Sequence, residues 1–405
     1  MFPRKVPFAG LALVCVCARA SAQGWTEQAV LSLFDQQSPM RREAQAAVAA
    51  AVETVRGRTL WPNPIAAYSR ETVGFTEFFQ AEQQLPVSGR LKFERQAMEP
   101  ARQSMDARGA ARLWEARSGL RMAFYRALAA QQQADAIRTG ITEIGAIAEL
   151  LRVREREGEG SRYDRVRVER EAADLRADLA MAQARARSER AALLAYLPAQ
   201  TDIASVQGEL ATKVMARTKD EVMRLALESR AEVRAEAGRL AQLGFEQQAA
   251  ERLRIPEPMI TAGVKRTQVF STANDTGAVI GVSMALPTFN KGKTEVARLA
   301  AEQQVVAARR DLLAQQIEAA VAGAYDVYAA RLEALQAFDR ETREVGEELL
   351  RTARVGYEEG ELGILQLLDA YRISRQTALR RLDLQVSVKE IEIELSRNAG
   401  FEVTQ

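Results

Sequence analysis

Two long tracts without proline, residues 101–197 and 288–405, constrain the fold more than any other feature of this sequence. Proline breaks helix interiors because it lacks a backbone N–H and its ring clashes with the preceding turn, so its absence permits uninterrupted helices. Ala, Arg, Glu, Leu and Gln dominate both tracts, and all five are good helix formers. A helix from about Arg90 to Glu157 would be roughly 100 Å long, which far exceeds a compact domain.

The apolar pattern inside these tracts also predicts helices. Larger apolar side chains in 313–335 recur at steps of three and four, which places them in one stripe along a helix. They are Leu313, Ile317, Val321, Tyr325, Tyr328, Leu332 and Leu335. Each tract breaks once at a pair of glycines, Gly158 and Gly160 in the first and Gly360 and Gly363 in the second. A polar break marked by glycine between two amphipathic helices is typical of a helical hairpin tip.

Strand signals appear between the proline clusters. Residues 258–269 (PMITAGVKRTQV) and 278–287 (AVIGVSMALP) alternate with a period of two, with apolar residues on one face and mostly small or polar residues on the other. This alternation predicts a pair of strands at about 257–287. The segment at about 63–87 occupies the matching place in the first half, but its alternation is poorer, so a strand pair is predicted there from position alone.

Two landmarks recur at nearly the same spacing. The octapeptide RVREREGE at 152–159 returns as RVGYEEGE at 354–361, which is 202 positions later. Leu85–Pro86 and Leu286–Pro287 both end a predicted strand pair, and they lie 201 positions apart. Because two independent landmarks share a spacing, the chain is predicted to contain an internal duplication.

The sequence therefore divides into a leader and two structural repeats. Arg4 and Lys5 precede a short apolar run, and the small residues ASA follow it before Gln23, which is typical of a secretory signal peptide. The apolar run has about half of the roughly 20 residues that a membrane-spanning helix needs. The predicted boundaries are 1–22 for the signal peptide, 23–208 for the first repeat with a tip at about 156–164, and 209–405 for the second repeat with a tip at about 357–366.

Composition argues against several classes of function. Both cysteines, Cys15 and Cys17, leave with the predicted signal peptide, and neither follows a small residue as a lipid-bearing cysteine would. Loss of the three basic leader residues changes the net charge from +2 to −1, so no basic excess points to nucleic acid. The chain has no histidine, no P-loop and no dinucleotide fingerprint. We therefore expect no enzyme, no cofactor, no resident metal and no nucleic-acid partner.

The predicted strand pairs need partners from outside the chain. Two repeats supply four strands, which are too few for a closed barrel with a lumen, and open sheet edges invite pairing with another chain. Several identical chains could close one barrel together, and an apolar outer face with a polar or small inner face suits a barrel in lipid. The predicted fold class is therefore mainly α with a small β part, built from a duplicated unit of helix, two strands, long helix and return helix.

The order of several short motifs resembles that of the TolC-like outer-membrane efflux proteins over nearly the whole mature chain. The most specific motif is YEEGELGILQLLDAYR at 357–372, which is similar to the family's second tip and return helix. The others are LSLFDQ at 31–36, WPNP at 61–64, LPVSGR at 85–90, GEGSRYDRV at 158–166 and GVSMALPTFNKGK at 281–293. Their order and spacing together carry the resemblance.

The resemblance implies a homotrimer with a 12-stranded β-barrel in the outer membrane of a Gram-negative bacterium, in contact with its lipid and continued by a long α-helical barrel across the periplasm. It implies that the tips bind a periplasmic adaptor, the membrane fusion protein, and that an inner-membrane pump of the RND type drives export. Such a channel is a passive duct, and the compact form of this sequence is similar to outer channels of heavy-metal pumps. Metal ions or drugs are the expected cargo, with type I protein secretion as an alternative.

The resemblance also implies roles for residues near the tips. Asp369 and Gln366 occupy the two positions of the pore constriction where the best-known members carry two Asp rings, so this constriction would hold one carboxylate ring and favour cations. Tyr357 and Asp164 match the pair that latches the gate, and Leu362 replaces the family's basic latch residue. The expected adaptor contacts are Gly158, Glu159, Ser161, Arg162, Gly360, Glu361, Leu362 and Gly363.

Two other classes of protein stay open at this point. A soluble periplasmic coiled-coil scaffold or adaptor without a pore would have similar long helices, although the alternating strands and the duplication argue against it. An enzyme would need a convergent catalytic constellation, and the sequence offers none. In a protein without a pore, Asp369 would be a solvated helix residue and Tyr357 a packing residue.

Overall fold

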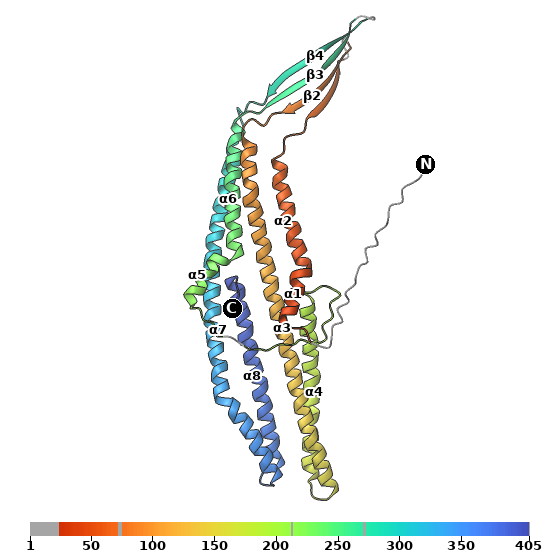
Figure 1. The fold of residues 1–405 in the computed structure, drawn as a ribbon, viewed down its shortest axis with the longest axis vertical. Helices are drawn as coiled ribbons and strands as arrows, with labels where there is room; N and C mark the ends of the chain where they lie inside the picture. The colour runs from red at the N-terminus through yellow and green to blue at the C-terminus, as the bar shows by residue number, and fades with distance from the viewer. Residues whose placement is uncertain (1–23, 72–74, 212–213, 270–272, 405) are drawn as a thin grey trace, which may run out of the picture.

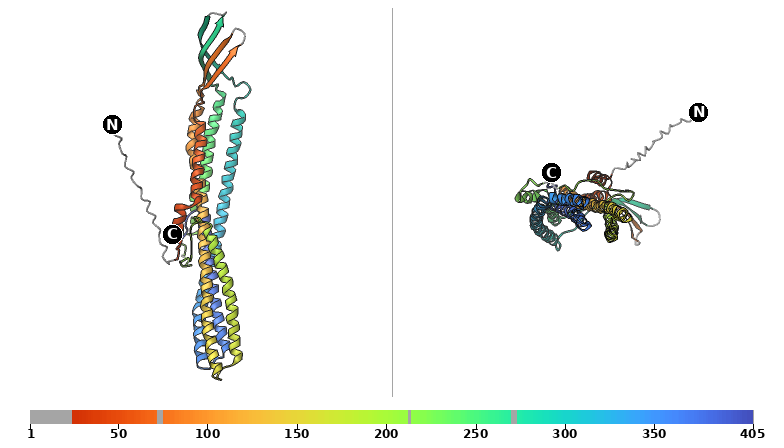
Figure 2. Two further views of the ribbon diagram at one scale, coloured as in Figure 1. Left: turned by 90° about the vertical axis from the view of Figure 1, so that its right-hand side faces the viewer. Right: turned by 90° about the horizontal axis from the view of Figure 1, so that it is seen from below.

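The computed structural model describes residues 24–71, 75–211, 214–269 and 273–404. The predicted signal peptide, residues 1–22, lies outside them. The molecule is long and narrow, with a small sheet at one end and the tips of two helical hairpins at the other (Figure 1, Figure 2). Both ends of the described chain lie near its middle, which we call the waist.

Two helices run through most of this length. α3 (Arg90–Arg156) has 67 residues and α7 (Lys293–Glu358) has 66, so each is about 100 Å long. The helix predicted from about Arg90 to Glu157 is confirmed. The shorter helices are α1 (Glu27–Gln37), α2 (Pro39–Arg58), α4 (Arg162–Leu194), α5 (Lys219–Ser229), α6 (Ala231–Glu251), α8 (Ile364–Ala399) and the 3₁₀ turn η1 (Arg252–Arg254). No helix within the described ranges is both long enough and apolar enough to cross a membrane.

Local sequence signals set several helix ends. Ser38 separates α1 from α2, because its side chain accepts a hydrogen bond from the backbone N–H of Met40 at 3.2 Å and Pro39 cannot continue the hydrogen bonding of α1. α5 begins with a capping box, in which Thr218 and Glu221 each accept a hydrogen bond from the other's backbone N–H.

Each long helix changes partners at the waist. On the sheet side α3 packs against α2 and α6, and on the tip side it packs against α4 and α8 (Figure 1). α7 packs against α6 on the sheet side and against α8 on the tip side. Because each long helix has a packing partner on both sides of the waist, its apolar stripe is covered on both sides, although the molecule has no single compact core.

The core consists of separate clusters along the length. The helical stripe predicted in 313–335 is confirmed, since Ile317 and Val321 are fully buried against Val388 of α8 and the other five residues of the stripe pack in the same cluster. The waist cluster includes Phe34, Leu120, Phe124, Leu128, Leu193, Ile203 and Ile393. The tip cluster includes Ile144, Leu151, Val168, Leu175, Ile364, Leu367 and Leu368. Each such side chain stabilises the fold by about 1.5–3 kcal/mol.

The sheet is antiparallel, with its strands in the order β1-β2-β3-β4. They are β1 (Ile65–Glu71), β2 (Thr76–Gln84), β3 (Pro258–Val269) and β4 (Ala273–Met284). Pairing of β2 with β3, as at Phe79 and Val264, joins one hairpin from each half of the chain. The fold is therefore mainly helical with a small sheet, as the sequence predicts.

Candidate functional site

One face of the sheet, which we call the apolar face, is uncovered. The strand register places one residue of each strand in a row across this face, namely Tyr68, Phe79, Val264 and Ala278. In the next row Ile280 is 83% exposed. Further apolar side chains of this face are Ala66, Ala81, Ile260, Ala262, Val282 and Met284, and the rows towards its two ends also carry Arg70, Glu77, Arg266, Thr276 and Gln83. An extended apolar surface of this kind marks a place where lipid or protein binds.

The opposite face is more polar. The residues that point to it include Ser69, Thr76, Gln80, Glu82, Thr261, Gly263, Lys265, Gly281 and Ser283, with Phe78, Met259 and Val279 among them. Successive strand residues point to opposite sides, so the alternation in the sequence separates two chemically different faces. A sheet of this kind can divide an apolar medium from an aqueous one.

β1 and β4 are the edge strands of the sheet. Within the described part of the chain each pairs on one side only, β1 with β2 and β4 with β3. The outer side of an edge strand presents backbone N–H and C=O groups that are free to pair with another strand. The sheet is therefore open at both edges.

The two hairpin tips have the same backbone turn. In the first tip the N–H of Glu159 donates to the carbonyl of Arg154 at 2.9 Å. In the second tip the N–H of Glu361 donates to the carbonyl of Gly356 at 2.8 Å. Both bonds link residues five apart around the end of a long helix, which is the Schellman arrangement. The two turns lie 202 positions apart, so the octapeptides that recur in the sequence form the same structure.

Glycine suits the backbone of both turns. Gly158 has φ 82° and Gly360 has φ 79°, a left-handed conformation that costs a residue with a Cβ atom about 1–2 kcal/mol. A Cβ atom at either position would meet no atom within 4 Å, so this cost comes from the backbone alone. The other predicted adaptor contacts lie on or beside these turns, with Leu362 half-buried and the rest exposed: Glu159, Ser161, Arg162, Glu361 and Gly363.

Asp369 and Gln366 lie on the exposed side of α8, in the first two turns after the tip. The other side of the same turns carries Leu367, Leu368 and Ala370, which are buried in the tip cluster. Both polar side chains therefore point away from the core of their own chain.

Tyr357 and Asp164 lie at the two tips, and in the described part of the chain no hydrogen bond joins them. Tyr357 packs against the tip cluster, and the guanidinium of Arg154 lies 5.7 Å from the centre of its ring. Asp164 lies in the first turn of α4, where the helix dipole favours a negative charge. Arg154 of one hairpin therefore contacts Tyr357 of the other at this level, beside the apolar packing of the tip cluster.

Other polar contacts fasten each hairpin internally. In the hairpin of α3 and α4, Glu169 accepts hydrogen bonds from Arg152 at 2.9 Å and from Arg165 at 2.7 Å. In the hairpin of α7 and α8, Arg354 donates to the hydroxyl of Tyr371 at 2.8 Å. Each hairpin is therefore held together by side chains of its own two helices.

One carboxylate at the tip end joins the two hairpins. Glu171 of α4 accepts a hydrogen bond from Arg372 of α8 at 2.9 Å, and its other oxygen lies 3.7 Å from Arg375. The family motifs do not single out Glu171. The sequence does hold a signal, because Glu171 and Arg372 are 201 positions apart, so the duplication places them at nearly the same height in the two hairpins.

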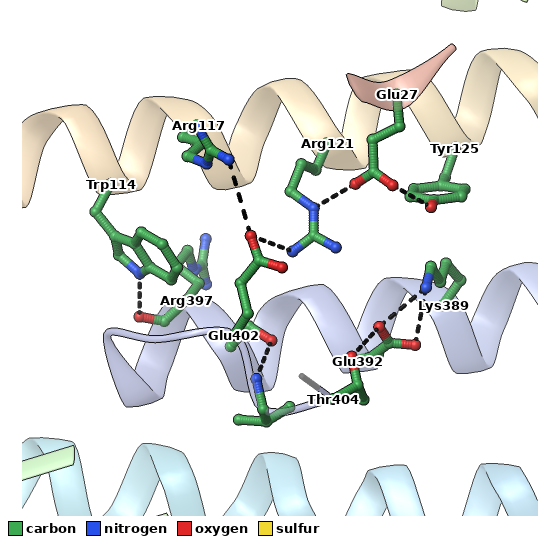
Figure 3. Close-up of polar contacts among 12 residues, drawn as sticks. Glu27, Trp114, Arg117, Arg121, Tyr125, Lys389, Glu392, Arg397, Glu402 and Thr404 are labelled. Atoms are coloured by element: carbon green, nitrogen blue, oxygen red, sulfur yellow. Dashed lines mark hydrogen bonds and ion pairs between the residues drawn. The ribbon is translucent and has the colours of Figure 1, made fainter. Parts of the chain in front are cut away.

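A polar network at the waist ties α1 to α3 (Figure 3). Glu27 accepts hydrogen bonds from Arg121 at 2.5 Å and from the hydroxyl of Tyr125 at 2.6 Å. Burial alone would raise the pKa of Glu27, but the Tyr125 hydrogen bond and the Arg121 charge outweigh it and lower this pKa. Burial and the hydrogen bond to Glu27 raise the pKa of Tyr125. At neutral pH the carboxylate is therefore charged and the phenol is neutral.

The C-terminal segment enters the same network (Figure 3). Glu402 lies 3.8 Å from Arg121. Lys389 and Glu392 form a buried ion pair on α8 at 2.9 Å, and Thr404 donates a hydrogen bond to Glu392 at 3.0 Å. No group of three or more His, Cys, Asp or Glu side chains among the described residues could hold a metal ion. These contacts place both ends of the described chain against the middle of α3, and the C-terminal segment also against the last turns of α8.

Solved structures with this arrangement of sheet and hairpins are outer-membrane channels. The outer-membrane channel OprN matches with a TM-score of 0.71 and 17% identity, over 94% of this chain and 91% of that one. The open state of the Neisseria gonorrhoeae MtrE outer membrane channel matches with a TM-score of 0.73 and 20% identity, over 94% and 90%. The chain therefore has the fold of the TolC-like outer-membrane channels, and the resemblance seen in its motifs is confirmed at the level of fold.

A curated protein is also similar in sequence. It is the cobalt-zinc-cadmium resistance protein CzcC of Cupriavidus metallidurans, which is 26% identical over 385 residues, covering 92% of this chain and 89% of CzcC. No family model matches the chain. The similarity to CzcC therefore covers nearly all of both chains.

Proposed function

We propose that this chain is the outer-membrane channel of a tripartite efflux system, a passive duct that a periplasmic adaptor and an inner-membrane pump open for export. The observation that carries the proposal is the sheet, which has an exposed apolar face, a more polar opposite face and two open edges. It stands at one end of the two long helices α3 and α7, which are each about 100 Å long. The fold shared with OprN and MtrE supports the same function.

In the proposed assembly three copies close one barrel of twelve strands in the outer membrane of a Gram-negative bacterium. β4 of one copy pairs with β1 of the next, the apolar face meets lipid, and the more polar face lines the lumen. β3 and β4 have 12 residues each and β2 has 9, which meets the roughly 9–11 that a tilted membrane strand needs, whereas β1 has 7. Each repeat, 23–208 and 209–405, supplies two strands and one hairpin.

At the tips the proposal assigns Asp369 and Gln366 to the constriction and the exposed turn residues to the adaptor. Both side chains leave the core of their own chain, which suits a lining position. A ring of Asp369 carboxylates, one from each copy, would favour cations. Tyr357 and Asp164 stay assigned to the gate, with Arg154 beside the Tyr357 ring.

Planar-bilayer recording tests the channel against the soluble scaffold. We expect the protein to need detergent for extraction from membranes and to conduct ions after reconstitution. Recovery in the soluble fraction, together with no conductance at any protein concentration, would favour the scaffold and remove the channel.

Metal ions are the cargo that we propose first, because CzcC is named for resistance to cobalt, zinc and cadmium. Deletion of the gene should lower the concentrations of these metals that stop growth, and the wild-type gene should restore them. If deletion instead changes drug sensitivity or the secretion of a protein, the cargo is different while the duct proposal stands.

A further inference from the structure

Glu171 is the carboxylate at the tip end whose ion pairs cross from one hairpin to the other. Given the proposed function, we infer that Glu171 is a positioning residue of the gate. Held by Arg372 and Arg375, it ties the two hairpins of each chain together and favours closed tips. The latch of this channel would then lie about two helical turns along α4 from Asp164.

Other polar contacts near the tips lie inside a single hairpin, unlike the ion pairs of Glu171 with Arg372 and Arg375. Arg152, Arg165 and Glu169 connect α3 to α4, and Arg354 and Tyr371 connect α7 to α8. Contacts of this kind move together with their own hairpin. Widening the tips must separate the hairpins, either within a chain or between copies. Within a chain, that separation breaks contacts that cross between hairpins and leaves the internal ones intact.

Burial makes the Glu171 pairs stronger than ordinary surface ion pairs. The side chains of Glu171 and Arg375 are each 17% exposed, and that of Arg372 is 46% exposed. The stem of Arg375 also lies against α3, since a Cβ atom at Gly140 would be 3.5 Å from its Cδ atom. Each oxygen of the carboxylate has its own guanidinium, and charge-assisted pairs in such partly covered geometry exceed the small value of exposed pairs.

The remaining crossing contacts have other roles. The Arg154 guanidinium over the Tyr357 ring is a weak and broad attraction, and the tip cluster is apolar and permits sliding. Nearer the waist, Gln133 of α3 donates to Asp383 of α8 at 2.7 Å and Arg126 of α3 donates to Glu390 of α8 at 2.6 Å, so the hairpins are also fastened at that end. The Glu171 pairs are directional and lie close to the tip, where a given rotation of a hairpin produces a larger displacement.

The tie also lies close to the proposed constriction. Asp369 precedes Arg372 by one turn of α8. The hydrogen bond and the charge of Glu171 are the main causes that raise the pKa of Arg372, and the charge of Asp369 raises it further. A hairpin released from Glu171 would carry both residues with it. Loss of the tie should therefore be seen as a change in pore opening.

Bilayer recording of Glu171→Gln with a matched control tests this inference. Glu169→Gln is the control, because Glu169 also pairs with two arginines but only inside its own hairpin. We expect Glu171→Gln to raise the fraction of time that the channel is open about tenfold at low salt, and Glu169→Gln to leave it near the wild-type value. At about 1 M salt, screening should raise wild-type opening toward that of Glu171→Gln.

A second variant keeps the test independent of Glu171. Arg372→Gln combined with Arg375→Gln should open the channel as Glu171→Gln does, and the triple variant should open no further, because all three changes remove one tie. If Glu171→Gln opens no more than the wild type, or if Glu169→Gln opens as much as Glu171→Gln, the proposed role of Glu171 is wrong, although the protein can still be a channel. If the wild-type protein never conducts, both the proposed channel function and the role of Glu171 are wrong.

Discussion

The Glu27 carboxylate accepts a hydrogen bond from Arg121 at 2.5 Å and so fastens α1 to the middle of α3. Arg121 is buried and lies close to Glu402 as well, which brings the two ends of the described chain to one guanidinium. The waist is thus bound by directional contacts, with the sheet on one side of it and the hairpin tips on the other.

Replacement of Glu27 with Gln should destabilise the protein by about 1–2 kcal/mol, because the buried Arg121 loses its main partner. The control is Glu43→Gln, since the pair of Glu43 with Arg112 is 3.6 Å long and mostly exposed, and such pairs contribute little. Thermal unfolding in detergent measures both variants. Equal melting temperatures for the two variants would contradict the role of Glu27.

The contribution of Glu27 should also depend on pH. Its folded pKa is lowered, because the Tyr125 hydrogen bond and the Arg121 charge outweigh the effect of burial, so the unfolded chain binds the proton more readily. The stabilisation is then complete at neutral pH and is lost as pH falls below its ordinary value of 4.5. The difference in melting temperature between wild type and Glu27→Gln should shrink as pH falls below 4.5. A constant difference would mean that the carboxylate charge is not its source.

Gly158→Ala and Gly360→Ala should each cost about 1–2 kcal/mol, because both positions have left-handed backbone and open space around them. Gly145→Ala is the control: it lies on the exposed side of α3 with no atom near its added Cβ, and it should be neutral or slightly stabilising. Melting temperatures of the three variants check this order. If Gly145→Ala were as harmful as the tip variants, the left-handed turn would not explain their cost.

Arginine on the two faces of β4 should have opposite consequences. Ile280→Arg places a charge on the apolar face and should cost about 2–4 kcal/mol if that face meets lipid near the middle of the membrane. Val279→Arg, one residue away, points to the more polar face and should be tolerated. The yield of assembled protein in the outer-membrane fraction measures both, and a larger loss for Val279→Arg would reverse the assignment of the faces.

Much of the helical architecture can be predicted from the sequence because its causes are local. Absence of proline, glycine at the tips and the apolar stripe of 313–335 each act within a few turns of one helix. The strands of the second half are predictable for the same reason, since alternation decides which side chains face together.

Contacts between segments that are distant in the sequence are harder to predict from the sequence. Pairing of β2 with β3 joins residues such as Phe79 and Val264, and no local pattern specifies that register. At the tips, Arg154 lies beside Tyr357 because the two helices that carry them, each about 100 Å long, end at the same level. The motif match alone predicts Asp164 as the partner of Tyr357 instead. The Glu171 tie follows from equal heights in two repeats, so only the spacing of the duplication hints at it.

Native mass spectrometry of the detergent-purified protein tests the central claim most directly. A sheet with two open edges should close only with other copies, and the account predicts particles of three chains that withstand removal of excess detergent. Particles of a single chain that stay soluble without detergent would contradict a barrel shared between copies.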